Sequence, residues 1–550
     1  MNPDQPEATA LLIKDGVFQA VGDDATILEH RQPDDVVIDA HKQRLIPGLN
    51  DSHIHGIRQG LNYAMELRWD AQTSLGEALE RLRLQASQTP PGKWVRVVGG
   101  WTYAQFKEQR HPTLDEINAV TGNVPAYVLH LYDYALINKA GLQALGFDKD
   151  RADTFPKGRI VRDHNGNPTG MFVAMPSAVI LYSLLNMLPK LDEDEALLST
   201  RHFMREMNRL GVTSFLDAGG GFLNYPDDYG VMRKLHADGQ LTTRIGFNLF
   251  AQNAGKEMED FTRWTEAFSP DEGDNMLKIN GAGEMLRASA YDFEDFILPR
   301  PELVPTMEDD LFPVVELLAR KRWPFRFHAT YDESASRILD VLEMVNREYP
   351  LEGLHWIFDH GETLKEHNIE RIARLGGGIS IQNRIAFQEK QFLERYGSDM
   401  ANDAPPIKKI LEMGIPLGNG TDATRVSSYN PWLSIHWTVS GKGMGGATLI
   451  SEENRVDRHT ALKLFTDNAW FSREEDKKGR IQPGMLGDFS VLSSDYFTIP
   501  EDEIRDLESV LTVLGGEVVY AKKPFECHEP AALEELPEWS PVRRFGGYRR

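Results

Sequence analysis

The sequence predicts an α/β fold: a (β/α)8 TIM-like barrel, a small β-sandwich domain formed by both termini, and an inserted subdomain after the first barrel strand. Three observations lead to this prediction. Short apolar runs alternate with longer amphipathic stretches through the middle of the 550-residue chain, a pattern typical of parallel strands joined by helices. Both ends of the chain are rich in strand-like segments, and residues 60–195 interrupt the alternation.

Strand-like runs near the two termini predict the small domain. Lys14-Asp15-Gly16 separates two of these runs and carries an Asp-Gly turn signal typical of a hairpin. So few strands do not form a stable sheet alone, so we expect residues 1–47 plus 475–523 to fold together. The runs lie at 10–13, 17–22, 36–40, 488–492 and 510–514.

The middle of the chain, residues 48–474, is predicted to form the barrel. Counting the apolar run before His53, there are about eight strand candidates, the number a (β/α)8 barrel requires. Helical patterns such as Asp309–Lys321 and Glu333–Glu348 fall between them. A doubly wound open sheet is the alternative, but no G-x-G-x-x-G motif follows the first strand. The other predicted strands are Val212–Leu216, Arg244–Phe250, Met276–Ile279, Pro324–His328, His355–Asp359, Gly378–Ile381 and Ile415–Asn419.

Two segments do not follow the barrel rhythm. Residues 60–195 are rich in aromatic side chains and contain a Gly-, Pro- and Asn-rich stretch at 158–170. We interpret them as an inserted subdomain over the barrel mouth. Residues 524–550, rich in Pro, Glu and Arg, are predicted to be a C-terminal extension packed on the surface.

Composition narrows the classes of partner. The formal net charge of −23 disfavours nucleic acid and anionic membranes, which bind clustered Lys and Arg. Cys527 is the only cysteine, which excludes an internal disulfide and a cysteine zinc site. No signal peptide pattern and no apolar run of about 20 residues is visible. We expect a cytoplasmic protein with a small-molecule substrate, no nucleic-acid or membrane partner, and a homodimer as its assembly.

Five polar side chains at predicted strand ends indicate a metal site. His53 and His55 are one residue apart, so on a strand they point to one face. His328, His360 and Asp422 each end or follow an apolar strand, and in a barrel those ends meet at the active-site mouth. Singly, each has an ordinary structural explanation, such as a hydrogen-bonded histidine or a helix cap. Together they form a nitrogen-rich set suited to Zn²⁺ or another divalent ion.

An additional oxygen ligand has two candidates. Lys278 lies inside an apolar run, where a lysine must be paired, reach solvent or lose its charge. Glu284 follows shortly after. Either residue could complete a site that holds two metal ions, although an unmodified lysine is a poor ligand because it is an ammonium at neutral pH.

Several stretches resemble the amidohydrolase superfamily, specifically its YtcJ-like or amidohydrolase-3 branch, which includes N-substituted formamide deformylase. The likeness covers about residues 10–523 and is carried by Leu45–His55, Gly158–Gly170, Leu210–Ser214, Gly418–Pro431 and Gly479–Asp488. The resemblance implies that His53, His55, His328, His360 and Asp422 bind metal, with Lys278 as a bridging ligand carboxylated by CO2. It further implies that Asp422 acts as the general base.

The resemblance implies hydrolysis of a non-peptide, amide- or formamide-like C–N bond by metal-activated water, with one or two divalent ions. His360 is expected to assist catalysis by stabilising the oxyanion. The substrate pocket is expected to include Trp101, Tyr103, His130, Glu284 and Arg384, with Arg425 near the mouth. Subdomain core and solvated surface are the alternative assignments for these side chains. A lactone or ester hydrolase on the same site and a catalytically silent binding relative are the alternative functions.

Overall fold

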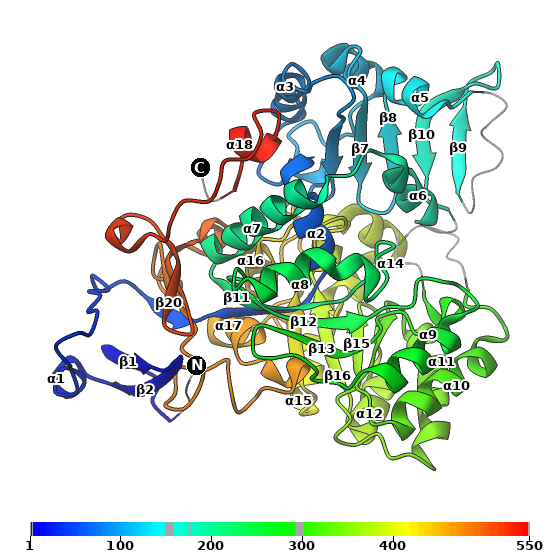
Figure 1. Cartoon of the computed structure of the whole chain (residues 1–550). Helices are drawn as coiled ribbons and strands as arrows, with labels where there is room; N and C mark the ends of the chain where they lie inside the picture. The colour runs from blue at the N-terminus through cyan, green and yellow to red at the C-terminus, as the bar shows by residue number, and fades with distance from the viewer. Residues whose placement is uncertain are drawn as a thin grey trace.

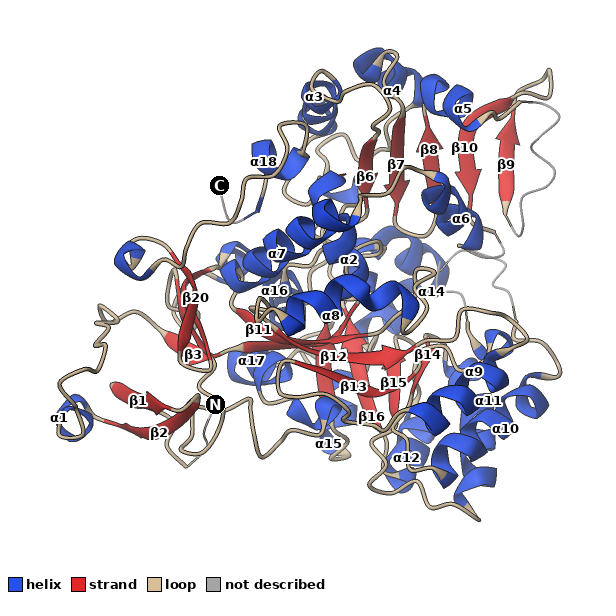
Figure 2. Ribbon diagram, viewed as in Figure 1, coloured by secondary structure: helices blue, strands red, loops and turns tan. Residues whose placement is uncertain are grey.

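A computed structural model describes residues 2, 4–148, 158–175, 178–292, 296 and 302–547. Helices and strands are mixed along the chain, which confirms the predicted α/β class. Figure 1 shows the parallel strands β11–β16 in the middle of the molecule and a second group, β6–β10, above them. Figure 2 shows helices beside both groups of strands.

Eight parallel strands form two four-stranded sheets. The first has the order β13-β12-β11-β4 and the second the order β14-β15-β16-β17. Every residue of these strands is buried, as expected for parallel sheets covered on both faces. Their bounds are β4 Leu49–Ile54, β11 Val212–Asp217, β12 Arg244–Leu249, β13 Leu277–Ala282, β14 Arg326–Ala329, β15 Ile357–His360, β16 Gly378–Gln382 and β17 Leu417–Gly420.

The two sheets meet at both edges. At one, a parallel bridge joins Ala282 to Phe325, and the Ala282 N–H donates to the carbonyl of Pro324 at 2.9 Å. At the other, the Asp422 N–H donates to the His53 carbonyl at 2.8 Å. These contacts bring the carboxyl ends of strands from both sheets to one place, which positions the site described below.

Helices connect and cover these strands. The caps explain several of their starts: Asp192 accepts from the Glu195 N–H to begin α7, and Asp457 accepts from the Thr460 N–H to begin α17. The helix bounds are α2 Gly56–Asn62, α7 Glu193–Arg209, α8 Gly230–Ala237, α9 Glu257–Ala267, α10 Met307–Arg320, α11 Asp332–Asn346, α12 Glu366–Leu375, α13 Arg384–Phe387, α14 Glu389–Asn402, α15 Ile407–Glu412, α16 Pro431–Ser440 and α17 Arg458–Thr466.

A six-stranded sheet lies within residues 66–173 and has the order β5-β6-β7-β8-β10-β9. Two clusters of buried apolar side chains pack on it, one around Trp69 and Trp101 and the other around Tyr127 and Phe172. Its elements are β5 Glu66–Leu67, β6 Val95–Val98, β7 Ala126–His130, β8 Tyr134–Ile137, β9 Arg159–Arg162 and β10 Pro168–Val173, with α3 Leu75–Ala86, α4 Leu114–Thr121, α5 Lys139–Leu145 and α6 Val179–Met187.

Segments from both ends of the chain share a sheet of order β20-β19-β18-β3. A separate hairpin, β1 with β2, touches it through a bridge between Val17 and Leu486. After this sheet, the chain packs against the six-stranded region, where Gln85 donates to the Trp539 carbonyl at 2.7 Å. The bounds are β1 Ala10–Lys14, β2 Val17–Gly22, α1 Asp24–Leu28, β3 Leu45–Pro47, β18 Phe489–Leu492, β19 Ser509–Leu514, β20 Glu517–Ala521 and α18 Pro541–Phe545.

Candidate metal centre

Six buried polar side chains meet at the carboxyl ends of the parallel strands. Two histidines come from β4 and the residue after it, two from β14 and β15, and the two carboxylates follow β13 and β17. None of the six is more than 4% exposed. They are His53, His55, Glu284, His328, His360 and Asp422.

The two carboxylates are the centre of this cluster. Oε2 of Glu284 lies 3.1 Å from Nδ1 of His328 and 3.2 Å from Nε2 of His360. Oδ1 of Asp422 lies 3.2 Å from Nε2 of His55 and 3.4 Å from Nε2 of His53. Each carboxylate is therefore in contact with two imidazoles, and together they reach all four.

Neighbouring groups fix the orientation of both β4 histidines. Nδ1 of His53 lies 2.9 Å from Oδ1 of Asp359, and Nδ1 of His55 donates to the carbonyl of Gly219 at 2.6 Å. Arg326 in turn donates from Nε to Oδ2 of Asp359 at 2.6 Å. With Nδ1 occupied in each ring, both Nε2 atoms face the carboxylates, an arrangement typical of metal-binding histidines.

The ligands His360 and Asp422 have unusual backbone conformations that neighbouring contacts stabilise. His360 has φ = 82° and Asp422 has φ = 52°, both in the left-handed region that non-glycine residues rarely adopt. Such conformations persist where surrounding contacts enforce them. One of these contacts is Asp51, whose carboxylate accepts from the Thr421 hydroxyl at 2.6 Å and from the His53 N–H at 3.0 Å.

The electrostatics favour a bound cation. Burial would raise the pKa of Asp422, but its close contacts with the imidazoles of His53 and His55 hold it well below its ordinary value. For Glu284, burial is likewise outweighed, by His328 and His53, and its pKa is also well below normal. Burial and the charge of Arg384 lower the pKa of His360 to about 3. Two anionic carboxylates and a neutral imidazole are the protonation states that bind metal.

His53 gives the clearest sign of surplus negative charge. Burial alone would lower the pKa of its imidazole, but the charges of Asp359 and Glu284 raise it to about 10. The carboxylates therefore attract positive charge to the place that Nε2 of His53 faces, which a metal ion would satisfy as well as a proton.

The donor set fits a divalent metal. Nε2 of His53 and Nδ1 of His360 are buried and make no hydrogen bond within the described residues. Three overlapping groups of ligand atoms each lie within 4.8 Å of one another. Four imidazoles and two carboxylates suit zinc and related ions. The groups are His53–His360–Asp422, His53–His55–Glu284 and Glu284–His328–His360.

The placement of Lys278 corrects the expectation that it is a carboxylated metal ligand. Lys278 is the second residue of β13, at the opposite end of the strand from the cluster. Its Nζ donates to the Ser472 carbonyl at 2.8 Å and to Asp271 at 3.1 Å, and it lies 3.4 Å from Oε1 of Glu474. The lysine is thus paired within the chain, away from the cluster. Glu284, the other candidate oxygen ligand, which we also expected to line the substrate pocket, lies in the ligand cluster.

The other expected pocket residues have structural partners. Trp101 packs against Trp69 and Phe106 in the core of the six-stranded region and donates to the Leu129 carbonyl at 2.9 Å. Tyr103 and His130 form an aromatic cluster with each other and with neighbouring rings. Across the described part of the chain, no hydrogen bond, ion pair or ring contact joins these three residues to the six-residue cluster.

Arg384 does reach the cluster, but as a paired side chain. Its Nε lies 3.8 Å from Oδ2 of Asp422, while its main partner is Glu362, whose Oε1 accepts from Nη2 at 2.6 Å. Both residues of this pair are buried. The guanidinium therefore has a carboxylate partner from within the chain.

Sequence reasoning missed the residues that position the ligands. Asp359 directly precedes His360, and Arg326 stands two residues before His328. A charged residue inside an apolar strand was the available signal for both, because such a residue needs a buried partner. The partnership itself joins β14 to β15 and is visible only in three dimensions.

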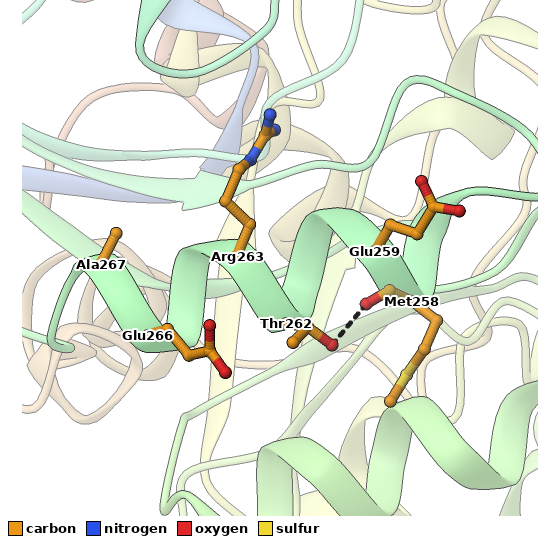
Figure 3. Close-up of a pocket in the computed structure, with 6 residues that line it drawn as sticks. All are labelled: Met258, Glu259, Thr262, Arg263, Glu266 and Ala267. Carbon is orange, nitrogen blue, oxygen red and sulfur yellow. Dashed lines mark hydrogen bonds between the residues drawn. The ribbon is translucent and has the colours of Figure 1, made fainter.

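A hollow along α9 lies apart from this centre. It measures about 630 Å³, and the side chains that line it come from one helix (Figure 3). Thr262 donates to the Met258 carbonyl at 2.7 Å, an ordinary interaction within a helix. No residue of the six-residue cluster lines the hollow, so it adds nothing to the site.

The fold and the cluster define a class: an α/β protein with a buried centre suited to a divalent metal. Comparison with known proteins identifies the family of this chain. A profile of the Amidohydrolase family matches residues 36–520, so the chain belongs to the amidohydrolase family. Family membership assigns it to the hydrolases. Within the described residues, no helix is both long and apolar enough to cross a membrane.

Two relatives support the YtcJ-like branch. One relative is YtcJ of Bacillus subtilis (strain 168), which is named as an unconfirmed amidohydrolase. It is 25% identical to this chain over 527 residues, and the alignment covers 93% of this chain and 96% of YtcJ. The N-substituted formamide deformylase of Arthrobacter pascens is 22% identical over 530 residues, covering 94% of this chain and 95% of the deformylase.

Solved structures share the fold. An uncharacterized metal-dependent hydrolase from Pyrococcus horikoshii OT3 aligns with a TM-score of 0.63 at 19% identity, covering 90% of this chain and 95% of that one. A mutant of the atrazine chlorohydrolase TrzN from Arthrobacter aurescens TC1, complexed with zinc and atraton, aligns with a TM-score of 0.52 at 13% identity, covering 96% and 92%.

Proposed function

We propose that this protein is a metal-dependent hydrolase that cleaves an amide- or formamide-like C–N bond of a small molecule, in a site at the mouth of a closed (β/α)8 barrel. The observation that carries the proposal is the position of Asp422, a buried anionic carboxylate between His53 and His55. The edge contacts between the two parallel sheets support closure of the barrel. The domain division into 1–47 plus 475–523, 48–474 and 524–550 is part of the same proposal.

The six clustered side chains would hold one or two zinc or related ions. When bound, such an ion would lower the pKa of water to about 7 and polarise a substrate carbonyl. The chain's own contribution is to keep both carboxylates anionic and His360 neutral, and to hold all six side chains oriented and buried. Asp359 and Gly219 orient the two β4 histidines, and Glu284 contacts the other two.

Asp422 is assigned the proton transfer. Its Oδ1 faces His53 and His55, while Oδ2 lies 3.8 Å from Nε of Arg384 and 4.0 Å from Nδ1 of His360. Oδ2 is therefore the oxygen that accepts the proton of the attacking water and passes it to the leaving nitrogen. The neutral imidazole of His360 lies beside this oxygen and assists the developing oxyanion.

A substrate panel tests the reaction class. Metal-loaded protein is offered N-substituted formamides, N-acyl amines, esters and lactones, and release of each product is measured. The likeness to an N-substituted formamide deformylase supports the formamides as the first group to try. We expect turnover of at least one formamide or N-acyl amine. Turnover confined to esters and lactones would contradict the C–N assignment and favour the alternative hydrolase.

A further inference from the structure

Two arginines lie beside one tyrosine ring next to the metal cluster. Arg58 follows His55 by three residues, and Arg425 follows Asp422 by three. The Cζ of Arg425 lies 4.0 Å from the centroid of the Tyr182 ring, and the Cζ of Arg58 lies 5.7 Å from the same centroid. Tyr182 belongs to α6, so the six-stranded region supplies the ring that joins two arginines from the parallel-strand region.

Neither guanidinium has a carboxylate within ion-pair distance in the described part of the chain. Arg58 is 5% exposed; its Nη1 donates to the Tyr182 hydroxyl at 3.4 Å, and its Nη2 is buried without a hydrogen bond. Nη1 of Arg425 is likewise buried without a partner. Burial and the nearby charge of Arg58 lower the pKa of Arg425. Arg58 is buried and Arg425 partly buried. A cation withdrawn from water without a counter-charge is costly, so an anion is the ligand that such a pair favours.

The pair lies close to the metal ligands. The loop after β11 contacts both: the Gly219 carbonyl accepts from His55, and a Cβ at Gly221 would come within 2.4 Å of Cδ of Arg58. Tyr132 extends this group of side chains, because its hydroxyl forms a hydrogen bond with the hydroxyl of Tyr182. Arg58 and the ligand His55 therefore contact the same short loop, next to the proposed site.

We propose that Arg58 and Arg425, with the Tyr182 and Tyr132 hydroxyls, form a subsite for a carboxylate group of the substrate. This inference rests on the proposed function and narrows it to N-acylated compounds that also carry a carboxylate. Asp217 already acts on Arg58 and offsets part of the positive charge, so the remainder matches a monoanion rather than a phosphate monoester, which carries nearly two charges. Arginine's planar fork also matches the two oxygens of a carboxylate.

Arg384 provides a contrast within the same site. It is buried and close to Asp422, but Glu362 already supplies its carboxylate. The chain thus neutralises Arg384 internally, whereas no carboxylate among the described residues is within ion-pair distance of Arg58 or Arg425. This difference is why the subsite is assigned to Arg58 and Arg425.

A matched substrate pair tests the subsite in the unaltered enzyme. N-formylphenylalanine and N-formylphenethylamine differ only by the carboxylate, and the methyl ester of the first masks that charge. With metal-loaded protein, we expect kcat/KM for the carboxylate compound, in one enantiomer at least, to exceed that of both neutral compounds by about 10-fold or more. Equal or better turnover of the neutral compounds overturns the subsite and leaves the proposed hydrolase intact.

A binding measurement separates failure of the subsite from failure of the proposed function. Metal-loaded Asp422→Asn protein is titrated with N-formylphenylalanine by calorimetry, with and without Arg425→Gln. We expect Arg425→Gln to weaken binding by about 10-fold or more, Arg425→Lys to weaken it less, and Arg371→Gln, a paired arginine on α12, to leave it unchanged. Equal affinity in Arg425→Gln overturns the subsite, whether or not any amide is hydrolysed.

Discussion

Nδ1 of His53 lies 2.9 Å from Oδ1 of Asp359, and this contact turns Nε2 of His53 toward the carboxylates of Glu284 and Asp422. Asp359 is itself held by Arg326, so β14, β15 and β4 are joined through one buried carboxylate. The orientation of a ligand ring therefore depends on a residue that does not touch the metal position.

Replacing Asp359 tests this dependence. Asp359→Asn is expected to weaken metal binding by about 10–100-fold, because a neutral amide replaces the carboxylate that pairs with both Nδ1 of His53 and Arg326. The affinity is measured by competition with a chromogenic chelator, and a thermal scan confirms that the variant is folded. Asp340→Asn, which changes a largely exposed carboxylate paired with Arg371, serves as the control. Unchanged affinity in Asp359→Asn would show that Asp359 does not position the ligand.

Asp422→Asn tests the assignment of the base. The amide cannot accept the proton of water, so turnover is expected to fall by about 10²–10⁴-fold. The other five ligands remain, and metal content measured on the same preparation should stay above half of the wild-type value. Activity within a few-fold of wild type would remove Asp422 from this role.

Two variants test whether Glu284 or Lys278 is the metal ligand. Glu284→Gln should lose metal and activity together, since Glu284 contacts two of the ligand histidines. Lys278→Met should keep wild-type metal content and activity per folded molecule, because Nζ is paired with Asp271 and Glu474 away from the cluster. Metal content and the rate of hydrolysis are measured for both variants. Loss of metal in Lys278→Met would restore the lysine as a ligand.

Glu474 is expected to make the free energy of unfolding decrease at acid pH. Burial would raise its pKa, but the charges of Lys478 and Lys278 lower it to about 2, below its ordinary 4.5. Because the folded-state pKa is the lower one, this contribution to stability is complete above pH 4.5 and is lost as pH falls toward 2. Glu474→Gln should destabilise the protein by about 3 kcal/mol near pH 7, since it removes a buried partner of two lysines.

The measurement for Glu474 is a series of thermal scans from pH 7 to the lowest pH at which the wild type is folded. The gap in unfolding midpoint between Glu474→Gln and wild type should narrow below pH 4.5. Glu475→Gln is the matched neighbour and should show no such narrowing. A gap that is constant with pH would mean that the carboxylate charge contributes nothing.

Much of the architecture could be predicted from local sequence. The predicted strands at 212–216, 244–250 and 378–381 overlap β11, β12 and β16, because buried parallel strands appear as apolar runs bounded by turns. The predicted strand at 276–279 overlaps β13 but ends too early, because the polar Asn280 and the residues after it continue the strand. A polar side chain buried within a sheet cannot be told from a turn residue by pattern alone.

The site was only partly predictable for the same kind of reason. Histidines at strand ends could be found from their spacing, and the structure brings His53, His55, His328 and His360 together with Asp422. Lys278 was misplaced because position within an apolar run does not say which end of the strand it occupies. Tyr182 and Arg58 were missed because their contact joins α6 to α2 across more than a hundred residues of chain.

Metal removal and replacement tests the central claim most directly. We expect the purified protein to contain at least about 0.5–1 divalent ion per chain, since a catalytic site requires stoichiometric metal. Dialysis against a chelator should abolish hydrolysis of the best substrate in the panel, and zinc or another divalent ion added back should restore it. A preparation free of divalent metal that keeps full activity would contradict the account.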